Sequence, residues 1–156
     1  INTPSSLGKA YKVYLNGCWE LSPLPYPEFD YIAYDGIYRS FKNKGVHSSE
    51  DVMTILIQGY STFTLYVRSY AESSYDYVMV GNLDKIITKD SSYTDTTLVK
   101  AHTRANQQSG KHLSSYTKVQ FTNIDKGIHF INILYRKDTS TNSGDDRGYL
   151  VIPRNQ

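Results

Sequence analysis

Short segments that alternate apolar and polar residues recur along this chain, and they constrain its fold more than any other feature. In residues 62–69 (TFTLYVRS), Phe63, Leu65 and Val67 fall on one side of an extended chain and polar or tyrosyl side chains on the other. β-Branched and aromatic residues, which favour strands, fill these segments. The same pattern predicts strands over 11–15, 52–58, 75–83, 118–122, 128–135 and 148–152.

Turn-forming residues separate the predicted strands, whereas helical patterns are almost absent. Glycine-containing turns over 58–61, 125–127 and 142–145 are of hairpin length. One helical turn is predicted over 97–104, since no longer window carries apolar residues at helical spacing. About seven or eight short strands with polar joints indicate an all-β, antiparallel two-layer sandwich, with a closed barrel as the structural alternative.

The chain length of 156 residues is that of one domain, so we expect a single β-sandwich over 1–156. Residues 23–27 (PLPYP) predict a stiff extended connector, because proline restricts its own backbone and that of the preceding residue. Residues 84–116 form a long polar connection. A connection of this length is either partly structured or a binding loop.

Charge and cysteine content exclude several classes of protein. The formal net charge of +2 arises from 17 basic and 15 acidic residues, a balance that argues against nucleic-acid binding. A single cysteine, Cys18, excludes an intrachain disulfide and a cysteine-rich zinc site, and we expect it to be a small packing residue. No apolar run approaches the roughly 18–20 residues of a membrane span, so no membrane insertion is expected.

Residue patterns that would support catalysis are weak, and we expect no enzyme. No serine lies in a Gly-x-Ser-x-Gly motif, and Cys18 lacks the flanking residues of a reactive thiol. His129 lies inside a predicted strand, where a hydrogen-bonded structural histidine is the ordinary interpretation. Glycoside hydrolysis needs two carboxylates across a cleft; Glu72 and Asp76 are the best pair, but nothing else in the sequence requires that activity.

Acidic residues near strand ends raise the question of calcium, which binds six to eight oxygen ligands. Glu72, Asp76 and Asp138 are the candidate ligands. The alternative is that these side chains organise turns, because aspartate readily accepts hydrogen bonds from nearby backbone groups. Calcium is therefore kept as an optional ligand, and no other cofactor is expected.

Tyrosine is the outlier in composition, with 15 of 156 residues. Tyrosine gives rigid contact area with a polar tip, and the apolar faces of sugar rings stack on such side chains. It is also a favoured strand residue, so many of the tyrosines are expected simply to pack. The candidates for ligand binding lie in or near predicted loops: Tyr70, Tyr75, Tyr93, Arg104 and Tyr116.

Two motifs together resemble a known family. The first is 66–80 (YVRSYAESSYDYVMV), and the second is 127–138 (GIHFINILYRKD) followed by 143–150 (SGDDRGYL). Their order resembles jelly-roll sandwich modules related to MAM domains, most of all modules in surface proteins of gut Bacteroidetes and in virion proteins of their phages. The resemblance implies jelly-roll topology. MAM modules also depend on disulfides, which this chain with one cysteine cannot form.

The resemblance further implies a non-catalytic module for adhesion or glycan recognition. Its expected partner is a cell-surface or dietary glycan, and its expected location is extracellular, on a bacterial surface or in a secreted protein. The alternative is a structural virion module of a fibre, tail or decoration protein, which we would expect to form a homotrimer. Within the motifs, Glu72 and Asp76 are expected to bind backbone donors or pair with Arg68 and Arg136.

Overall fold

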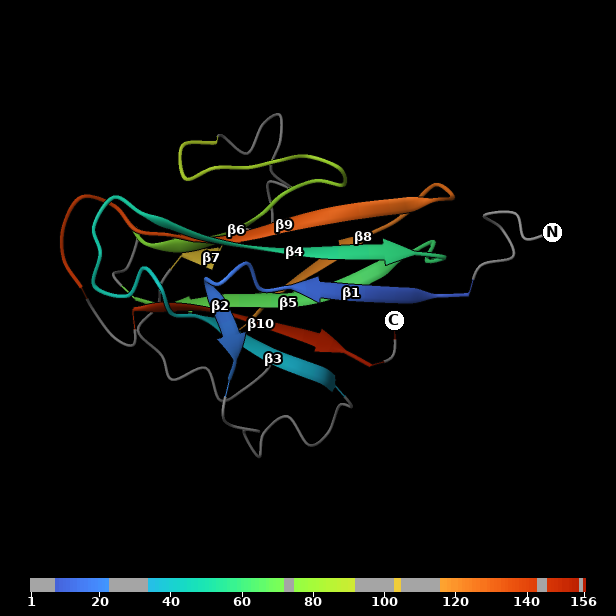
Figure 1. Cartoon of the computed structure of the whole chain (residues 1–156), viewed down its shortest axis with the longest axis horizontal. Coiled ribbons are helices and arrows are strands. Elements are labelled where there is room, and N and C mark those ends of the chain that lie inside the picture. Colours follow the sequence, from blue (N-terminus) through green and yellow to red (C-terminus); the bar gives the residue numbers. More distant parts are fainter. Residues whose placement is uncertain are drawn as a thin grey trace.

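The computed structural model describes residues 8–22, 34–71, 75–91, 103–104 (backbone only), 116–142, 146–154 and 156. Within these ranges the chain forms two five-stranded sheets that face each other, with every strand pair antiparallel (Figure 1). None of the described residues belongs to a helix that could cross a membrane. The predicted all-β sandwich is confirmed.

Each sheet draws strands from both halves of the sequence. The first sheet has the order β1 (Ala10–Tyr14), β4 (Glu50–Gln58), β9 (Ile128–Arg136), β6 (Tyr77–Val80) and β7 (Thr103–Arg104). The second has the order β2 (Trp19–Leu21), β3 (Tyr34–Ser40), β10 (Arg147–Pro153), β5 (Phe63–Tyr70) and β8 (Thr117–Phe121). β2, β3 and β7 lie outside the predicted strands, and Thr103–Arg104 is extended where a helical turn was predicted.

The connections between strands show that the turns predicted as hairpins are crossovers between the two sheets. Apart from β2–β3 and β6–β7, each step from one described strand to the next changes sheet, as in a jelly roll. The turns at 58–61, 125–127 and 142–145 therefore join strands of different sheets, so they are not hairpins. The reason is that β4 and β5 each carry an apolar side that must face the core, and a few extended residues span the roughly 10 Å between stacked sheets.

The core lies between the sheets and is built from the predicted apolar positions. Met53, Ile55 and Ile57 on β4 face Phe63 and other core residues of the second sheet, and all are almost fully buried. Cys18 is partly buried and packs against this cluster, as expected for a small packing residue.

The two sheets lie close together near the start of β10. A Cβ atom on Gly148 would lie 2.7 Å from Val78 Cγ2 of the first sheet and 3.3 Å from Trp19 Cη2. Glycine is therefore required here by the close approach of the two layers. The indole Nε1 of Trp19 crosses the interface and donates to the carbonyl oxygen of Asp51 at 3.0 Å.

Residues 84–91, the start of the polar connection, fold over the outer face of the first sheet. Ile87 packs there against Met79 and Leu134. Asp84 accepts hydrogen bonds from the backbone N–H of Phe130 at 3.1 Å and from Nδ1 of His129 at 2.6 Å. His129 Nε2 lies 2.8 Å from the carbonyl oxygen of Asp125. The prediction of a hydrogen-bonded structural histidine is confirmed, and the Asp84 hydrogen bond raises the pKa of His129.

Candidate ligand-binding end of the sandwich

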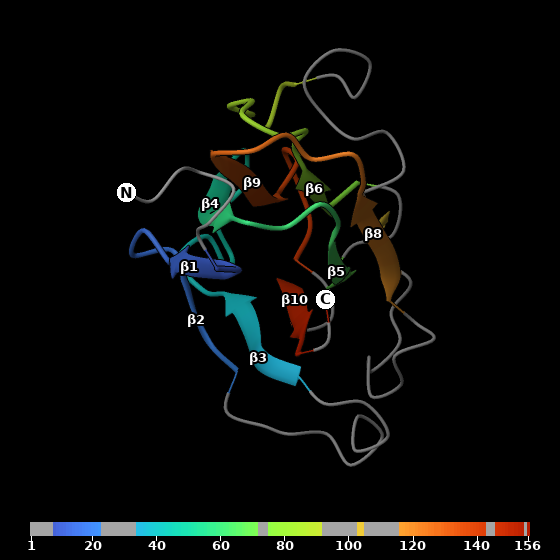
Figure 2. The ribbon, with the colours of Figure 1, turned by 90° about the vertical axis from the view of Figure 1, so that its right-hand side faces the viewer.

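One end of the sandwich gathers most of the predicted site residues. Here β5 and β9 end while β6 and β10 begin, as the pairings of Tyr70 with Arg147 and of Tyr77 with Arg136 show. It is the left end in Figure 1, and Figure 2 shows the two layers facing each other. We call it the Tyr75 end, after its most exposed aromatic residue among those described.

Four of the five predicted ligand-binding residues lie at the Tyr75 end. Tyr70 ends β5, and Tyr75 directly precedes β6. Arg104 pairs with Tyr77 through its backbone, and Tyr116 directly precedes Thr117, which pairs with Val67. Tyr93 lies outside the described residues.

On the outer face of the second sheet, a buried arginine organises two of these tyrosines. The Arg68 guanidinium carbon lies 5.5 Å from the Tyr70 ring centroid and 6.0 Å from that of Tyr116. Both distances suit cation–π contact. Tyr116 is 8% exposed, whereas Tyr70 stays partly accessible. Of this pair, Tyr70 therefore offers more surface to a ligand.

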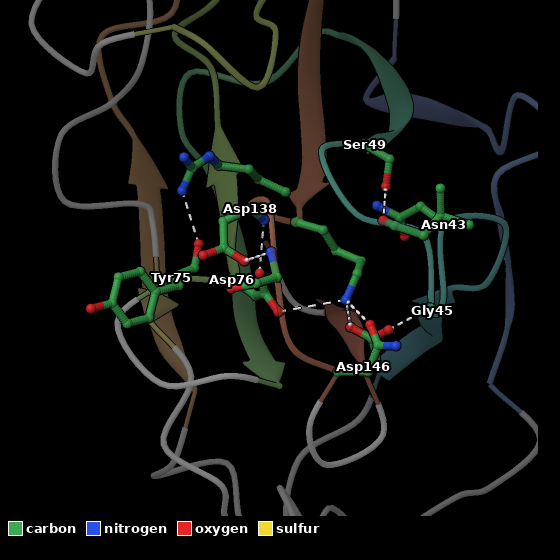
Figure 3. A network of polar contacts seen from close by, with 12 residues as sticks. Asn43, Gly45, Ser49, Tyr75, Asp76, Asp138 and Asp146 are labelled. Atoms are coloured by element: carbon green, nitrogen blue, oxygen red, sulfur yellow. Dashed lines mark hydrogen bonds and ion pairs between the residues drawn. The ribbon is translucent and has the colours of Figure 1, made fainter.

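On the first sheet, a second arginine holds the exposed tyrosine. Arg136 Nη1 donates to the carbonyl oxygen of Tyr75 at 2.8 Å, and its guanidinium carbon lies 4.8 Å from the Tyr77 ring centroid. The Tyr75 side chain is left 56% exposed, and its ring points away from the polar groups behind it (Figure 3). An anchored backbone thus presents an aromatic ring to solvent.

Sequence reasoning missed the roles of both arginines. Arg68 was recognisable as one of the residues on the polar side of its strand, but its neighbours across the sheet were not. The outer face there also includes the Tyr149 ring and Glu20, whose Oε2 accepts from Arg39 Nε at 2.6 Å and Arg147 Nη1 at 3.2 Å. The hydrogen bond from Arg39 lowers the pKa of Glu20. These partners are set by strand register, which a single sequence does not reveal.

A buried polar network underlies the exposed aromatics (Figure 3). Its centre is Lys137, whose ammonium lies 2.6 Å from Asp146 Oδ1, 2.8 Å from Asn142 Oδ1 and 3.7 Å from Asp76 Oδ2. The side chains of Lys137, Asp76 and Asp146 are 0%, 0% and 3% exposed. Asp146 also accepts hydrogen bonds from the Tyr135 hydroxyl at 2.9 Å and from the backbone N–H of Gly45.

Asp76 accepts a hydrogen bond from the backbone N–H of Asp138 at 2.9 Å, which confirms that it binds a backbone donor. Its ionic partner is Lys137, whereas the sequence had suggested Arg68 or Arg136. Glu72 lies outside the described residues. The network joins the segment before β6 to the segment after β9, and so fixes the backbone that carries Tyr75.

Burial raises the pKa of Asp76 to about 6, although the Asp138 N–H and the Lys137 ammonium act in the opposite direction. A carboxyl with a raised pKa in the folded state stabilises the fold below its unfolded pKa, and this contribution is lost as pH rises through about 6. The wild-type free energy of unfolding should therefore fall between pH 4 and pH 7 by about 1–3 kcal/mol through this group.

Asp76→Asn should remove that part of the pH dependence, because the amide oxygen still accepts from Asp138 and carries no charge. Urea unfolding at several pH values measures it. Asp90→Asn is the matched control, because this side chain is 79% exposed. In this variant the free energy of unfolding should depend on pH as it does in wild type. If Asp76→Asn kept the wild-type pH dependence, Asp76 would not be the group that causes the fall in stability.

Two of the candidate calcium ligands, Asp76 and Asp138, are already engaged by groups of the protein. One oxygen of Asp76 faces an N–H group and the other faces the Lys137 ammonium, and Asp138 Oδ1 accepts from the backbone N–H of Ser140 at 3.3 Å. Calcium needs six or more oxygens around one point. In the part of the chain that the structure describes, no group of three His, Cys, Asp or Glu residues could hold a metal.

We accordingly expect a chelator to leave the melting temperature unchanged. The measurement is thermal unfolding with EDTA and with added calcium, with magnesium as the control for ionic strength. A midpoint that drops with EDTA and recovers only with calcium would show a bound ion, and Glu72 would then be its first candidate ligand.

No family model and no curated protein matches the chain. Among solved structures, the chain is similar to that of TmCBM61 in complex with β-1,4-galactotriose. The match has a TM-score of 0.44 and 8% sequence identity, and it covers 91% of this chain and 83% of that one.

Proposed function

We propose that this protein is a non-catalytic recognition module that binds a glycan at the Tyr75 end. The observation that carries the proposal is the exposed Tyr75 ring, held by Arg136 beside Tyr77. Flat aromatic faces beside guanidinium donors suit sugars, which present C–H faces and hydroxyl groups. Tyr70 adds a second partly accessible ring on the neighbouring sheet. Tyr93, Arg104 and Tyr116 stay predicted contributors.

The absence of catalysis is part of the proposal. Glycoside hydrolysis would need two accessible carboxylates that face the substrate. The Asp76 and Asp146 carboxylates are buried and engaged by Lys137 and by backbone N–H groups. They support the loops that carry the aromatic residues and do not reach solvent.

We place the module outside the cell, on a bacterial surface or on a virion, with a cell-surface or dietary glycan as ligand. A glycan array tests the binding itself and should give discrete hits. A blank array together with a trimer of concentration-independent mass in light scattering would instead support the structural virion module.

Tyr75→Ala should weaken binding to any glycan found on the array by at least about tenfold, corresponding to about 1.4 kcal/mol. Its melting temperature should barely change, because the ring is largely exposed. Isothermal titration calorimetry with wild type and variant measures the effect.

The matched control is Tyr14→Ala. Tyr14 is 39% exposed on the edge strand β1, which β4 and β9 separate from β6. The Tyr14→Ala variant should bind the glycan with the same affinity as wild type. Equal losses in both variants, or no loss in Tyr75→Ala, would contradict a site at the Tyr75 end.

A further inference from the structure

The buried network contains an amine and a carboxyl group in contact, sealed from water. Lys137 Nζ and Asp146 Oδ1 are 2.6 Å apart, and their side chains are 0% and 3% exposed. Lys137 directly follows β9 of the first sheet, and Asp146 directly precedes β10 of the second. An ion pair so deeply buried loses the hydration of both charges, and its mutual attraction only partly offsets that loss.

The surroundings of the Asp146 carboxyl resemble those that stabilise acyl transfer. The Tyr135 hydroxyl donates to Oδ1, and the Gly45 backbone N–H donates to Oδ2. Fixed donors of this kind stabilise the negative charge that develops on an acyl oxygen when an amine attacks the carbon. The Lys137 chain is held in place by its contact with Asn142 Oδ1. The reacting groups are thus positioned before any reaction begins.

A third group is available to move protons. Asp76 Oδ2 lies 3.7 Å from Lys137 Nζ and has no hydrogen-bond partner among the described residues. Its other oxygen is fixed by the Asp138 N–H. A carboxyl group that burial brings to a pKa of about 6 can both accept and release a proton near neutral pH.

We infer that Lys137 and Asp146 form an intramolecular amide cross-link, with Asp76 as the proton relay. Asp76 takes a proton from the Lys137 ammonium, and the free amine attacks Cγ of Asp146. The new N–Cγ bond forms as one Cγ–O bond breaks. Two of the three ammonium protons leave with that oxygen as one water molecule, and the third stays on the amide nitrogen. No oxidant, reductant or cofactor is needed.

The cross-link would replace two buried charges by a neutral amide and close the connection between β9 and β10 into a covalent ring at the Tyr75 end. It is independent of glycan binding, since it depends only on groups inside the sandwich.

Intact-mass spectrometry of the denatured full chain tests the inference. Wild type should weigh one water molecule less than its sequence, and a digest should contain a branched peptide that joins Lys137 to Asp146. Lys137→Arg keeps the positive charge but should have the full sequence mass. Asp76→Asn keeps the acceptor for Asp138 and should stay unreacted. Lys126→Met, at an exposed position outside the network, is the control and should still lose water.

Three results would overturn the inference. A wild-type chain of full sequence mass shows that the pair stays ionic. Loss of ammonia instead of water assigns the acyl group to Asn142. Loss of water that persists in Lys137→Arg shows a cyclised aspartate without a cross-link.

Discussion

Lys137→Met is expected to lower the free energy of unfolding by about 3–5 kcal/mol. The substitution leaves the Asp146 carboxylate, 3% exposed, without its cationic partner, and Asp76 loses its nearest positive charge. A buried charge that loses its partner keeps its desolvation penalty and loses its compensation. The loss is expected whether the wild-type pair is ionic or closed to an amide. Urea unfolding at pH 7 measures it.

The double variant Lys137→Met/Asp146→Asn separates charge from packing. It removes the uncompensated carboxylate, so it should be more stable than Lys137→Met alone. Lys126→Met, at an exposed position in the turn before β9, is the control and should stay within about 0.5 kcal/mol of wild type. If Lys137→Met behaved like this control, the network would have no structural role at this end.

Trp19→Ala should destabilise the protein by about 3–5 kcal/mol, because it opens a large cavity between the sheets. Trp19 is 2% exposed, and its indole reaches Asp51 O and lies against Gly148. Trp19→Phe fills part of the space but leaves the Asp51 carbonyl without its donor, which should cost about 1–3 kcal/mol. The urea concentration at the midpoint of unfolding should fall, while the dependence of the free energy of unfolding on urea concentration stays constant.

Leu21→Ala is the matched control, in the same three-residue strand. Leu21 is 63% exposed, so its loss should change the free energy of unfolding by less than about 0.5 kcal/mol. Similar losses for Trp19→Ala and Leu21→Ala would show that β2 contributes through strand pairing and not through the tryptophan.

The strands that sequence reasoning found are those with a clear apolar alternation, such as β5, where Phe63, Leu65 and Val67 all face the core. β3 was not predicted, because Tyr34–Ser40 contains Asp35 and Gly36 and lacks a clear alternation of apolar and polar residues. Its extended form depends on pairing with β10 and β2, which lie far away in sequence. Local propensity is weak where tertiary pairing decides the structure.

The candidate site was predictable in part, for the same reason. Tyrosine abundance and loop position pointed to Tyr70 and Tyr75, which do lie at one end of the sandwich. Nothing in the sequence indicated that Arg136 would hold Tyr75 from another strand, or that Lys137 would meet Asp76 across the network. Such contacts join segments that become neighbours only when the sheets stack.

Alternation of side chains along extended segments was enough by itself to determine that this protein is all-β and to favour a sandwich over a barrel, because each strand must bury one face. Which sheet each strand joins, which arginine anchors which tyrosine and which charges meet in the interior were decided only by the tertiary structure. Turn sequences of a few residues fit a hairpin and a crossover equally well, and the choice between them comes from the apolar faces that must close on one core.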